Sequence, residues 1–372
     1  MSSRHYIRGA AAVGLAVGLC ACHGNTVRQP HVPNHPGDFD LRRPPCEAAP
    51  RVDGRSSDLV IRYLGVGGLY IEWHGVSLLT APLFTRYGPL QVAFGEIEWD
   101  DDAIRRGLEG LPLETTRAVL VGHSHYDHLA DVPPILIDHA PLASLYVNRT
   151  GARMLAAFPE LSGRIVVLEA HGDPWMWLAD REGARLPIRA RTLPYDHAPH
   201  WLGMHFAKGE IEESWDDWSG RKLRAMKEGK TFAFVVDLMS NDGAVLYRIY
   251  YQDASGLPAE LPGDRPVDLA VLTIAAHQSV AGYPETLIRE TRARHVLVIH
   301  YEDFLRDSGE PLRMVPTLTD KKARRFLEAV EREAAGREPS LRGPDPCGCG
   351  PCGAAWSMPL PGEWLRFRVP HE

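Results

Sequence analysis

Three histidines and an aspartate gather within six positions, as His123, His125, Asp127 and His128. They directly follow the apolar, β-branched run 118–121, which predicts a buried strand with the polar residues on the loop at its carboxyl end. Alternation along the loop directs His123 and His125 to one side, while Asp127 and His128 continue around the turn. Imidazole and carboxylate groups at this density suit Zn²⁺, Mn²⁺ or iron. The stretch therefore predicts a metal site.

The segment His123-Ser124-His125-Tyr126-Asp127-His128 resembles the signature of the metallo-β-lactamase superfamily of metal-dependent hydrolases. The resemblance implies an α/β fold, an αββα sandwich with a two-metal site at one edge of the two sheets. It also implies further metal ligands that reach this edge from the ends of later strands.

Three later positions match the family's remaining ligands. His197 follows a strand predicted at 188–193 and matches the third-motif histidine, with His200 and His205 as rivals. Asp253 follows a strand ending at 251 and matches the aspartate that bridges both metals. The resemblance further assigns the last ligand to His300. It also implies how the ligands are divided: the first metal would be held by His123, His125 and His197, and the second by Asp127, His128 and His300. Asp253 would lie between the two metals.

The resemblance implies two Zn²⁺ ions, with Mn²⁺ or iron as alternatives. Two metals about 3.5–4 Å apart can share a hydroxide that attacks the substrate, so no serine or cysteine nucleophile is needed. Asp127 is expected to orient the water or pass a proton. His277, after a strand at 267–275, is predicted to be a second catalytic residue, because phospholipase-like members place substrate contacts there. A one-metal enzyme also fits, since the sequence gives ligands but not occupancy.

Strands and helices alternate along the chain, which favours an α/β layer arrangement. The predicted strands lie at 59–64, 69–73, 76–80, 144–148, 164–168, 231–239, 244–251, 295–299 and 361–367, and the predicted helices at 101–110, from about 131, and at 149–158, 285–293 and 318–335. The segment 202–230 has no clear period and is interpreted as a flap or insertion. Its Trp215 and Trp218 either line a substrate groove or pack against the domain edge.

The N-terminus predicts export. Two arginines precede the apolar run 9–21, which is too short for a confident transmembrane helix and is typical of a secretory signal. Its end, Leu19-Cys20-Ala21-Cys22, resembles a bacterial lipobox, which implies a signal peptide at 1–21 and a lipid on Cys22. An ordinary cleaved signal or an uncleaved anchor are the alternatives. We expect a Pro-rich tether at 22–57, the hydrolase domain at 58–372, and location at the outer membrane facing the periplasm.

Four further cysteines, Cys46, Cys347, Cys349 and Cys352, remain in the mature chain, three of them in the Cys-rich segment 340–355. In an exported protein an even number of cysteines favours disulfides, and four cysteines allow three pairings. A second zinc site is the alternative, although the chain lacks a matching C-x₂-C pair on another segment.

The net charge and one further motif indicate which classes of partner and substrate to expect. The formal net charge of −7 over 372 residues argues against a nucleic-acid partner. The Ile299-His300-Tyr301-Glu302-Asp303-Phe304 segment resembles the branch that contains the N-acyl-phosphatidylethanolamine phospholipase D and the ascorbate-phosphate lactonase. This resemblance implies a phosphodiester or phospholipid-like substrate at the cell envelope. Hydrolysis of a lactone, carboxylic ester or β-lactam is the alternative, as is a non-catalytic metal-binding envelope protein. The oligomeric state is left open.

Overall fold

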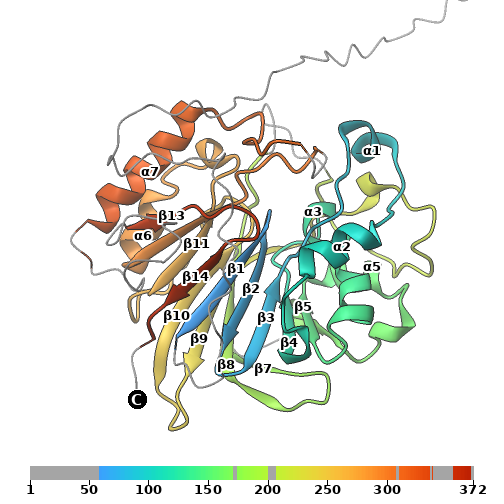
Figure 1. Cartoon of the computed structure of the whole chain (residues 1–372), viewed down its shortest axis with the longest axis horizontal. Coiled ribbons are helices and arrows are strands. Elements are labelled where there is room, and N and C mark those ends of the chain that lie inside the picture. Colours follow the sequence, from blue (N-terminus) through green and yellow to red (C-terminus); the bar gives the residue numbers. More distant parts are fainter. Residues whose placement is uncertain are drawn as a thin grey trace, which may run out of the picture.

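The computed structural model describes residues 58–170, 174–199, 207–306, 310–335, 337 and 355–369. In this part of the chain, two seven-stranded sheets pack face to face, and helices cover their outer faces (Figure 1). Apolar side chains from both sheets fill the space between them, among them Ile61, Leu193 and Phe234. The αββα sandwich predicted from the sequence is confirmed.

The first sheet has the order β14-β1-β2-β3-β4-β5-β6. The strands β14, β1, β2 and β3 pair antiparallel, whereas β3 to β6 pair parallel. The carboxyl end of β4 therefore lies at the same sheet edge as those of its parallel neighbours. The strands are β1 (Leu59–Gly65), β2 (Gly68–Trp73), β3 (Val76–Thr80), β4 (Thr116–Leu120), β5 (Ser144–Val147), β6 (Ile165–Val167) and β14 (Trp364–Phe367).

The second sheet has the order β13-β12-β11-β10-β9-β8-β7. The strands from β7 to β10 pair antiparallel, and those from β10 to β13 pair parallel. The sequence pattern did not predict β7 or β13, and β8 begins earlier than expected. The strands are β7 (Met176–Ala179), β8 (Arg185–Tyr195), β9 (Thr231–Met239), β10 (Val245–Gln252), β11 (Leu269–Thr273), β12 (His295–Ile299) and β13 (Trp356–Ser357).

Side-chain caps explain where several helices begin. The Asp100 carboxylate accepts the Ala103 N–H at 2.8 Å ahead of α2, and Asn148 accepts the Gly151 N–H at 2.7 Å ahead of α5. The helix expected from about residue 131 is broken into α4 and a π-turn. The helices are α1 (Pro89–Phe94), α2 (Asp101–Leu108), α3 (Tyr126–Leu129), α4 (Val132–Pro134), α5 (Arg149–Leu155), α6 (Glu285–Thr291) and α7 (Asp320–Ala334), with shorter turns at Leu113–Thr115, Ile135–His139, Pro159–Leu161, Leu168–Ala170, Leu223–Ala225 and His277–Ser279.

The described part of the segment 202–230 packs on the first sheet's side of the molecule. Trp215 and Trp218 are buried, and the Trp218 ring lies 5.1 Å from that of Phe158. The Trp215 N–H donates to the carbonyl of Arg153, at 2.9 Å. Of the two expectations for these tryptophans, packing at the domain edge is therefore the one observed.

A buried ion network crosses the second sheet. Arg248 donates to Asp237 at 2.7 Å and to Asp264 at 2.6 Å, and Arg189 donates to Asp237 at 2.9 Å. The Asp237 carboxylate is fully buried, and these guanidinium groups are its charged partners.

Across the described ranges, the helices are too short or too polar to span a membrane. The lipidation candidate Cys22, the tether, and the cysteines at 46, 347, 349 and 352 lie outside the described residues.

Candidate metal centre

The His-rich loop leaves β4 and enters the short helix α3. His123 and His125 lie on the loop, and Asp127 and His128 lie in the first turn of α3. All four side chains are buried. The loop therefore holds four groups of metal-binding type away from solvent, as its sequence predicts.

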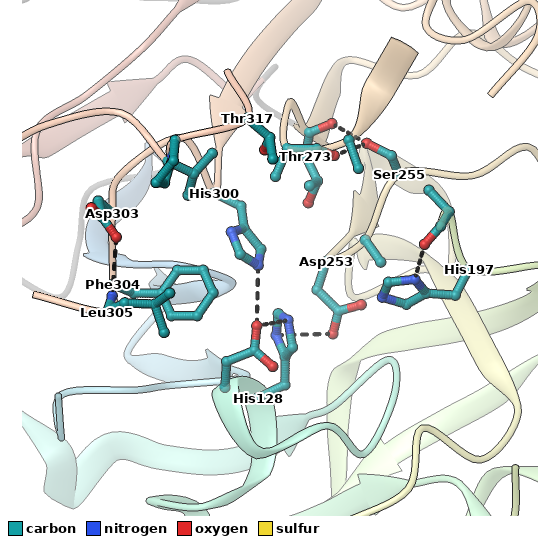
Figure 2. Close-up of a pocket in the computed structure, with 17 residues that line it drawn as sticks. His128, His197, Asp253, Ser255, Thr273, His300, Asp303, Phe304, Leu305 and Thr317 are labelled. Carbon is teal, nitrogen blue, oxygen red and sulfur yellow. Dashed lines mark hydrogen bonds and ion pairs between the residues drawn. The ribbon is translucent and has the colours of Figure 1, made fainter. Parts of the chain in front are cut away.

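The other predicted ligands arrive from the second sheet. His197 follows β8, Asp253 follows β10 and His300 follows β12. The rivals His200 and His205 lie outside the described residues. Figure 2 shows His128, Asp253 and His300 directed toward one another, with His197 beside Asp253. The structure thus brings the seven residues predicted as ligands to one edge of the sandwich.

These side chains form three overlapping groups whose candidate ligand atoms lie within 4.8 Å of one another: His123, His125 and His197; His123, His128 and Asp253; and Asp127, His128 and His300. The first and third groups are the two ligand sets that the resemblance implies. The second group joins them through Asp253, in the position of a bridging residue.

Asp253 lies at the centre of the contacts. Its carboxylate accepts the Gly122 N–H at 3.0 Å and lies 3.0 Å from His123 Nδ1 and 3.8 Å from His128 Nδ1. Burial raises the pKa of Asp253, but the nearby His123 and His128 outweigh burial and hold the pKa below its ordinary value. The side chain is therefore a carboxylate at neutral pH.

The second ligand set is organised around Asp127. Its Oδ2 atom lies 3.4 Å from His128 Nε2 and 3.5 Å from His300 Nε2. Burial opposes ionisation of Asp127, but these two histidines and His125 bring its pKa well below the ordinary value. Burial lowers the pKa of His128 to about 3, so that its imidazole is neutral and able to bind a metal.

Glycine at position 122 permits this close approach. A Cβ atom there would lie 2.5 Å from Asp253 Oδ1 and 2.6 Å from the Phe232 carbonyl oxygen. Real Cβ atoms do not approach other atoms so closely, so any side chain would push Asp253 away from the loop. The residue immediately before His123 is therefore fixed by the position of Asp253.

A buried clamp holds the backbone of His300. His300 has a left-handed backbone with φ of 57°, which is unfavourable for a residue with a side chain. Its N–H donates to the Tyr63 hydroxyl at 3.0 Å, and that hydroxyl donates to Glu302 at 2.6 Å. The carboxylate also accepts the N–H groups of Val66 and Tyr301. Tyr63 and Glu302 therefore position His300, and neither residue was predicted to have this role.

Glu228 is a second residue that the sequence did not single out. Its Oε2 atom lies 3.8 Å from His125 Nε2, and its carbonyl oxygen accepts the Ser124 N–H at 2.9 Å. Asn148 also donates to that carbonyl, at 2.8 Å. Glu228 lies in the segment 202–230, where no periodicity predicts which side chains point inward.

His277 lies outside the ligand cluster, and the structure does not support its predicted contact with substrate. Its Nδ1 atom is 2.9 Å from the Ile274 carbonyl oxygen, and its ring packs 5.2 Å from that of Phe326 on α7. It does not line the cavity beside the ligands. The reason is the left-handed backbone of Ala276, with φ of 58°, which turns the chain just before His277.

The residues present fit a divalent metal. In the part of the chain that the structure describes, the buried imidazole nitrogens without a hydrogen-bond partner include His123 Nε2, His128 Nδ1 and His300 Nδ1. Buried polar atoms are rarely left unsatisfied, and each such atom costs free energy. A cation bound among neutral imidazoles and carboxylates would satisfy them, and this nitrogen and oxygen donor set suits zinc, manganese and iron alike.

Two recesses open beside the ligands. One, of about 330 Å³, is lined by Asp127, His128, His197, Asp253 and His300 together with mainly apolar residues. The other, of about 440 Å³, is more polar and contains Lys208, Glu228 and Lys230. Of the candidate ligands, His197 is the one that lines both recesses.

No protein-family model matches the chain, and no curated protein sequence matches it. Solved structures do resemble it. The metallo hydrolase Igni18 from the archaeon Ignicoccus hospitalis aligns with a TM-score of 0.48 at 14% identity, over 84% of this chain and 100% of that one. The metallo-β-lactamase fold protein YhfI from Bacillus subtilis aligns with a TM-score of 0.46 at 11% identity, over 83% of this chain and 99% of that one.

A third similar structure, CmlA from Streptomyces venezuelae, is a diiron β-hydroxylase. It aligns with a TM-score of 0.46 at 13% identity, over 84% of this chain and 55% of that one. At these values the likeness carries no argument of its own, and the fold assignment rests on the strand order given above.

Proposed function

We propose that the chain is a metal-dependent hydrolase of the metallo-β-lactamase superfamily. The observation that carries the proposal is the convergence of seven histidine and aspartate side chains, from the ends of β4, β8, β10 and β12, into overlapping groups of metal-binding geometry. A non-catalytic metal-binding protein would need the ligands, but it would not need the open cavity beside them.

The candidate ligands would form two metal-binding sets. His123, His125 and His197 would hold one ion, Asp127, His128 and His300 a second, and Asp253 would contact both. Zinc is our first choice of ion, with manganese or iron as alternatives, and such ions would supply Lewis acidity that activates water and polarises the bond under attack. Asp127, ionised and exposed to the cavity, is placed to orient the attacking water and to accept its proton.

A serine nucleophile is not required, and the serine that lines the cavity is already engaged. Ser255 lines the cavity, but its hydroxyl donates to the carbonyl oxygens of Thr273 and Ala275, at 3.0 and 2.7 Å (Figure 2). No nearby imidazole or carboxylate is seen to take its proton within the described residues. Activated water is therefore the nucleophile that the site supports.

For the substrate we propose a phosphodiester of phospholipid-like character. The support is the resemblance of residues 299–304 to the branch that contains the N-acyl-phosphatidylethanolamine phospholipase D, together with the apolar lining of the cavity. Lactone, carboxylic ester and β-lactam hydrolysis remain the alternative reactions. We further propose a lipid on Cys22, location at the cell envelope, and disulfides among the cysteines at 46, 347, 349 and 352.

The test is metal content together with turnover on a panel of a chromogenic phosphodiester, a phospholipid, a lactone and a cephalosporin. We expect about two ions per chain, and phosphodiester turnover that is lost on chelation and restored by Zn²⁺. Asp253→Asn should reduce turnover by at least a hundredfold. The matched control, His139→Asn, changes a half-buried histidine that belongs to none of the candidate ligand groups, and it should behave as wild type.

The outcomes separate the alternatives. One ion with turnover keeps the hydrolase and removes the bridging role of Asp253. Turnover only on the lactone or the cephalosporin would replace the substrate class. Failure to bind any metal after reconstitution would overturn the proposal as a whole. Radiolabelled palmitate incorporated into wild type but not into Cys22→Ser would support the lipid anchor.

A further inference from the structure

The cavity beside the second ligand set has an apolar wall. Phe304 and Leu305 lie on one side of it (Figure 2), and Val315 and Pro316 also line it. Four alanines add further apolar surface, at positions 198, 254, 275 and 276. Apart from the ligand candidates, this surface is what a bound molecule would touch.

The polar side chains of the lining offer little to a substrate. The Ser255 hydroxyl is engaged by two carbonyl oxygens, as described above, and the Thr273 hydroxyl donates to the Gln252 carbonyl oxygen at 3.1 Å. Asp303 accepts the Leu305 N–H at 3.3 Å. These groups are already paired within the protein, and the lining adds only the hydroxyl of Thr317, so a substrate group entering here gains mainly from burial of apolar surface.

The charged side chains of the cavity lining also favour an apolar ligand. Of the described residues that line this cavity, none is a lysine or an arginine, and the one ionisable side chain outside the ligand set is Asp303. Arg86, Arg306 and Arg313 are near enough to favour the ionised form of Asp303, but burial raises its pKa overall. A carboxylate or phosphate on the substrate would find no positively charged side chain among these lining residues, whereas an uncharged apolar chain needs none.

The wall begins next to the reacting centre. The Phe304 ring packs edge-on against the imidazole of His300, with ring centroids 5.2 Å apart. A group attached to the bond under attack at the ligand cluster would therefore pass directly onto Phe304. The cavity of about 330 Å³ falls at the small end of the usual range for ligand pockets.

We propose that this cavity binds an alkyl or acyl chain of the substrate, and that Phe304, Leu305 and Val315 determine the length of chain accepted. The role of this cavity in catalysis rests on the proposed hydrolase function. Binding of the alkyl or acyl chain does not, because the apolar side chains of the wall need no metal to bind it.

The first experiment measures binding without turnover. The metal-free full-length chain is titrated calorimetrically with n-alcohols from butanol to decanol. Burial of each added methylene should tighten binding about three- to fourfold until the cavity is filled. Leu305→Asp should weaken decanol binding at least tenfold, whereas Leu90→Asp, the control at a residue 76% exposed on α1, should leave it unchanged. Equal effects of the two substitutions, or no dependence on chain length, would overturn the proposal.

The second experiment measures chain-length preference in catalysis. Metal-loaded protein is given p-nitrophenyl phosphodiesters that carry alkyl chains of increasing length. Ala275→Leu, which fills part of the cavity from a partly buried position on its lining, should move the best substrate to a shorter chain. Its folding is checked by the unchanged metal content.

The two experiments distinguish failure of the proposed apolar pocket from failure of the proposed hydrolase function. Length-dependent alcohol binding without turnover on any substrate would keep the apolar pocket and reject the hydrolase. Metal-dependent turnover with no preference for chain length, unaffected by Ala275→Leu, would keep the hydrolase and reject the pocket.

Discussion

Tyr63→Phe removes one oxygen atom from the clamp that holds His300. The Tyr63 hydroxyl accepts the His300 N–H at 3.0 Å and donates to Glu302 at 2.6 Å, and the side chain is completely buried. Phenylalanine would leave the N–H without an acceptor and the buried carboxylate without one of its donors. A buried group left unsatisfied costs about 1–3 kcal/mol, so we expect the free energy of unfolding to fall by about 2–4 kcal/mol.

The substitution should also weaken one half of the metal site. The left-handed backbone of His300 costs about 1–2 kcal/mol, and without the clamp it can relax and swing its imidazole away from Asp127. Loss of such a supporting partner typically reduces metal affinity 10- to 100-fold. We expect one of two zinc-binding events to weaken by this factor, while the event that involves His125 and His197 is unchanged.

Urea denaturation followed by tryptophan fluorescence, and zinc titration against a chromophoric chelator, would measure both effects. Tyr301→Phe is the matched control, because its buried hydroxyl donates to the Pro359 carbonyl oxygen at 2.7 Å and does not contact the His300 backbone. If Tyr63→Phe destabilised the protein no more than Tyr301→Phe and bound two zinc ions with wild-type affinity, the clamp would have no positioning role.

Three further predictions follow from other contacts. Gly122→Ala should displace Asp253 and abolish the bridging of the two ligand sets, so zinc stoichiometry should drop, whereas Gly243→Ala in the exposed β9–β10 turn should not affect it. Arg248→Ala should lower stability by about 3–5 kcal/mol because it removes one of the two guanidinium partners of the buried Asp237 and leaves only Arg189, and the double variant Arg248→Met/Asp237→Leu should recover most of the loss in a urea titration. Burial lowers the pKa of His277, so below about pH 6.5 the unfolded chain binds a proton that the folded chain does not. The free energy of unfolding should therefore fall by up to about 1.3 kcal/mol between pH 7.5 and pH 5.5. This loss should be absent in His277→Gln.

The elements that carry the centre were accessible from the sequence because their signals are local. The apolar run before His123 and the strand ahead of His300 are short, and the polar residue of interest follows the end of each within three positions. By contrast, the contact of Tyr63 with Glu302 joins residues 239 positions apart, and no local pattern indicates it. The same holds for Glu228, which reaches His125 from a segment without periodicity.

The failures have physical causes as well. His277 follows a strand as a substrate-contacting residue would, but the left-handed backbone at Ala276 redirects it onto α7. Such a conformation is uncommon for alanine, so the sequence does not indicate it. The strands β7 and β13 are short, and they form by pairing with longer neighbours rather than from a pattern of their own.

The ligand set is divided between the two sheets. His123, His125, Asp127 and His128 follow a strand of the first sheet, whereas His197, Asp253 and His300 follow strands of the second. An ion held among them would act as a further cross-link between two layers that apolar packing and a few buried hydrogen bonds, such as those of Tyr63 and Gly122, already join. Demetallation would then raise the rate at which this edge of the sandwich opens, so that amide hydrogens near the ends of β4 and β12 exchange faster with solvent than those at the opposite edge. Metal supply would in that case govern the lifetime of the folded protein as well as its chemistry.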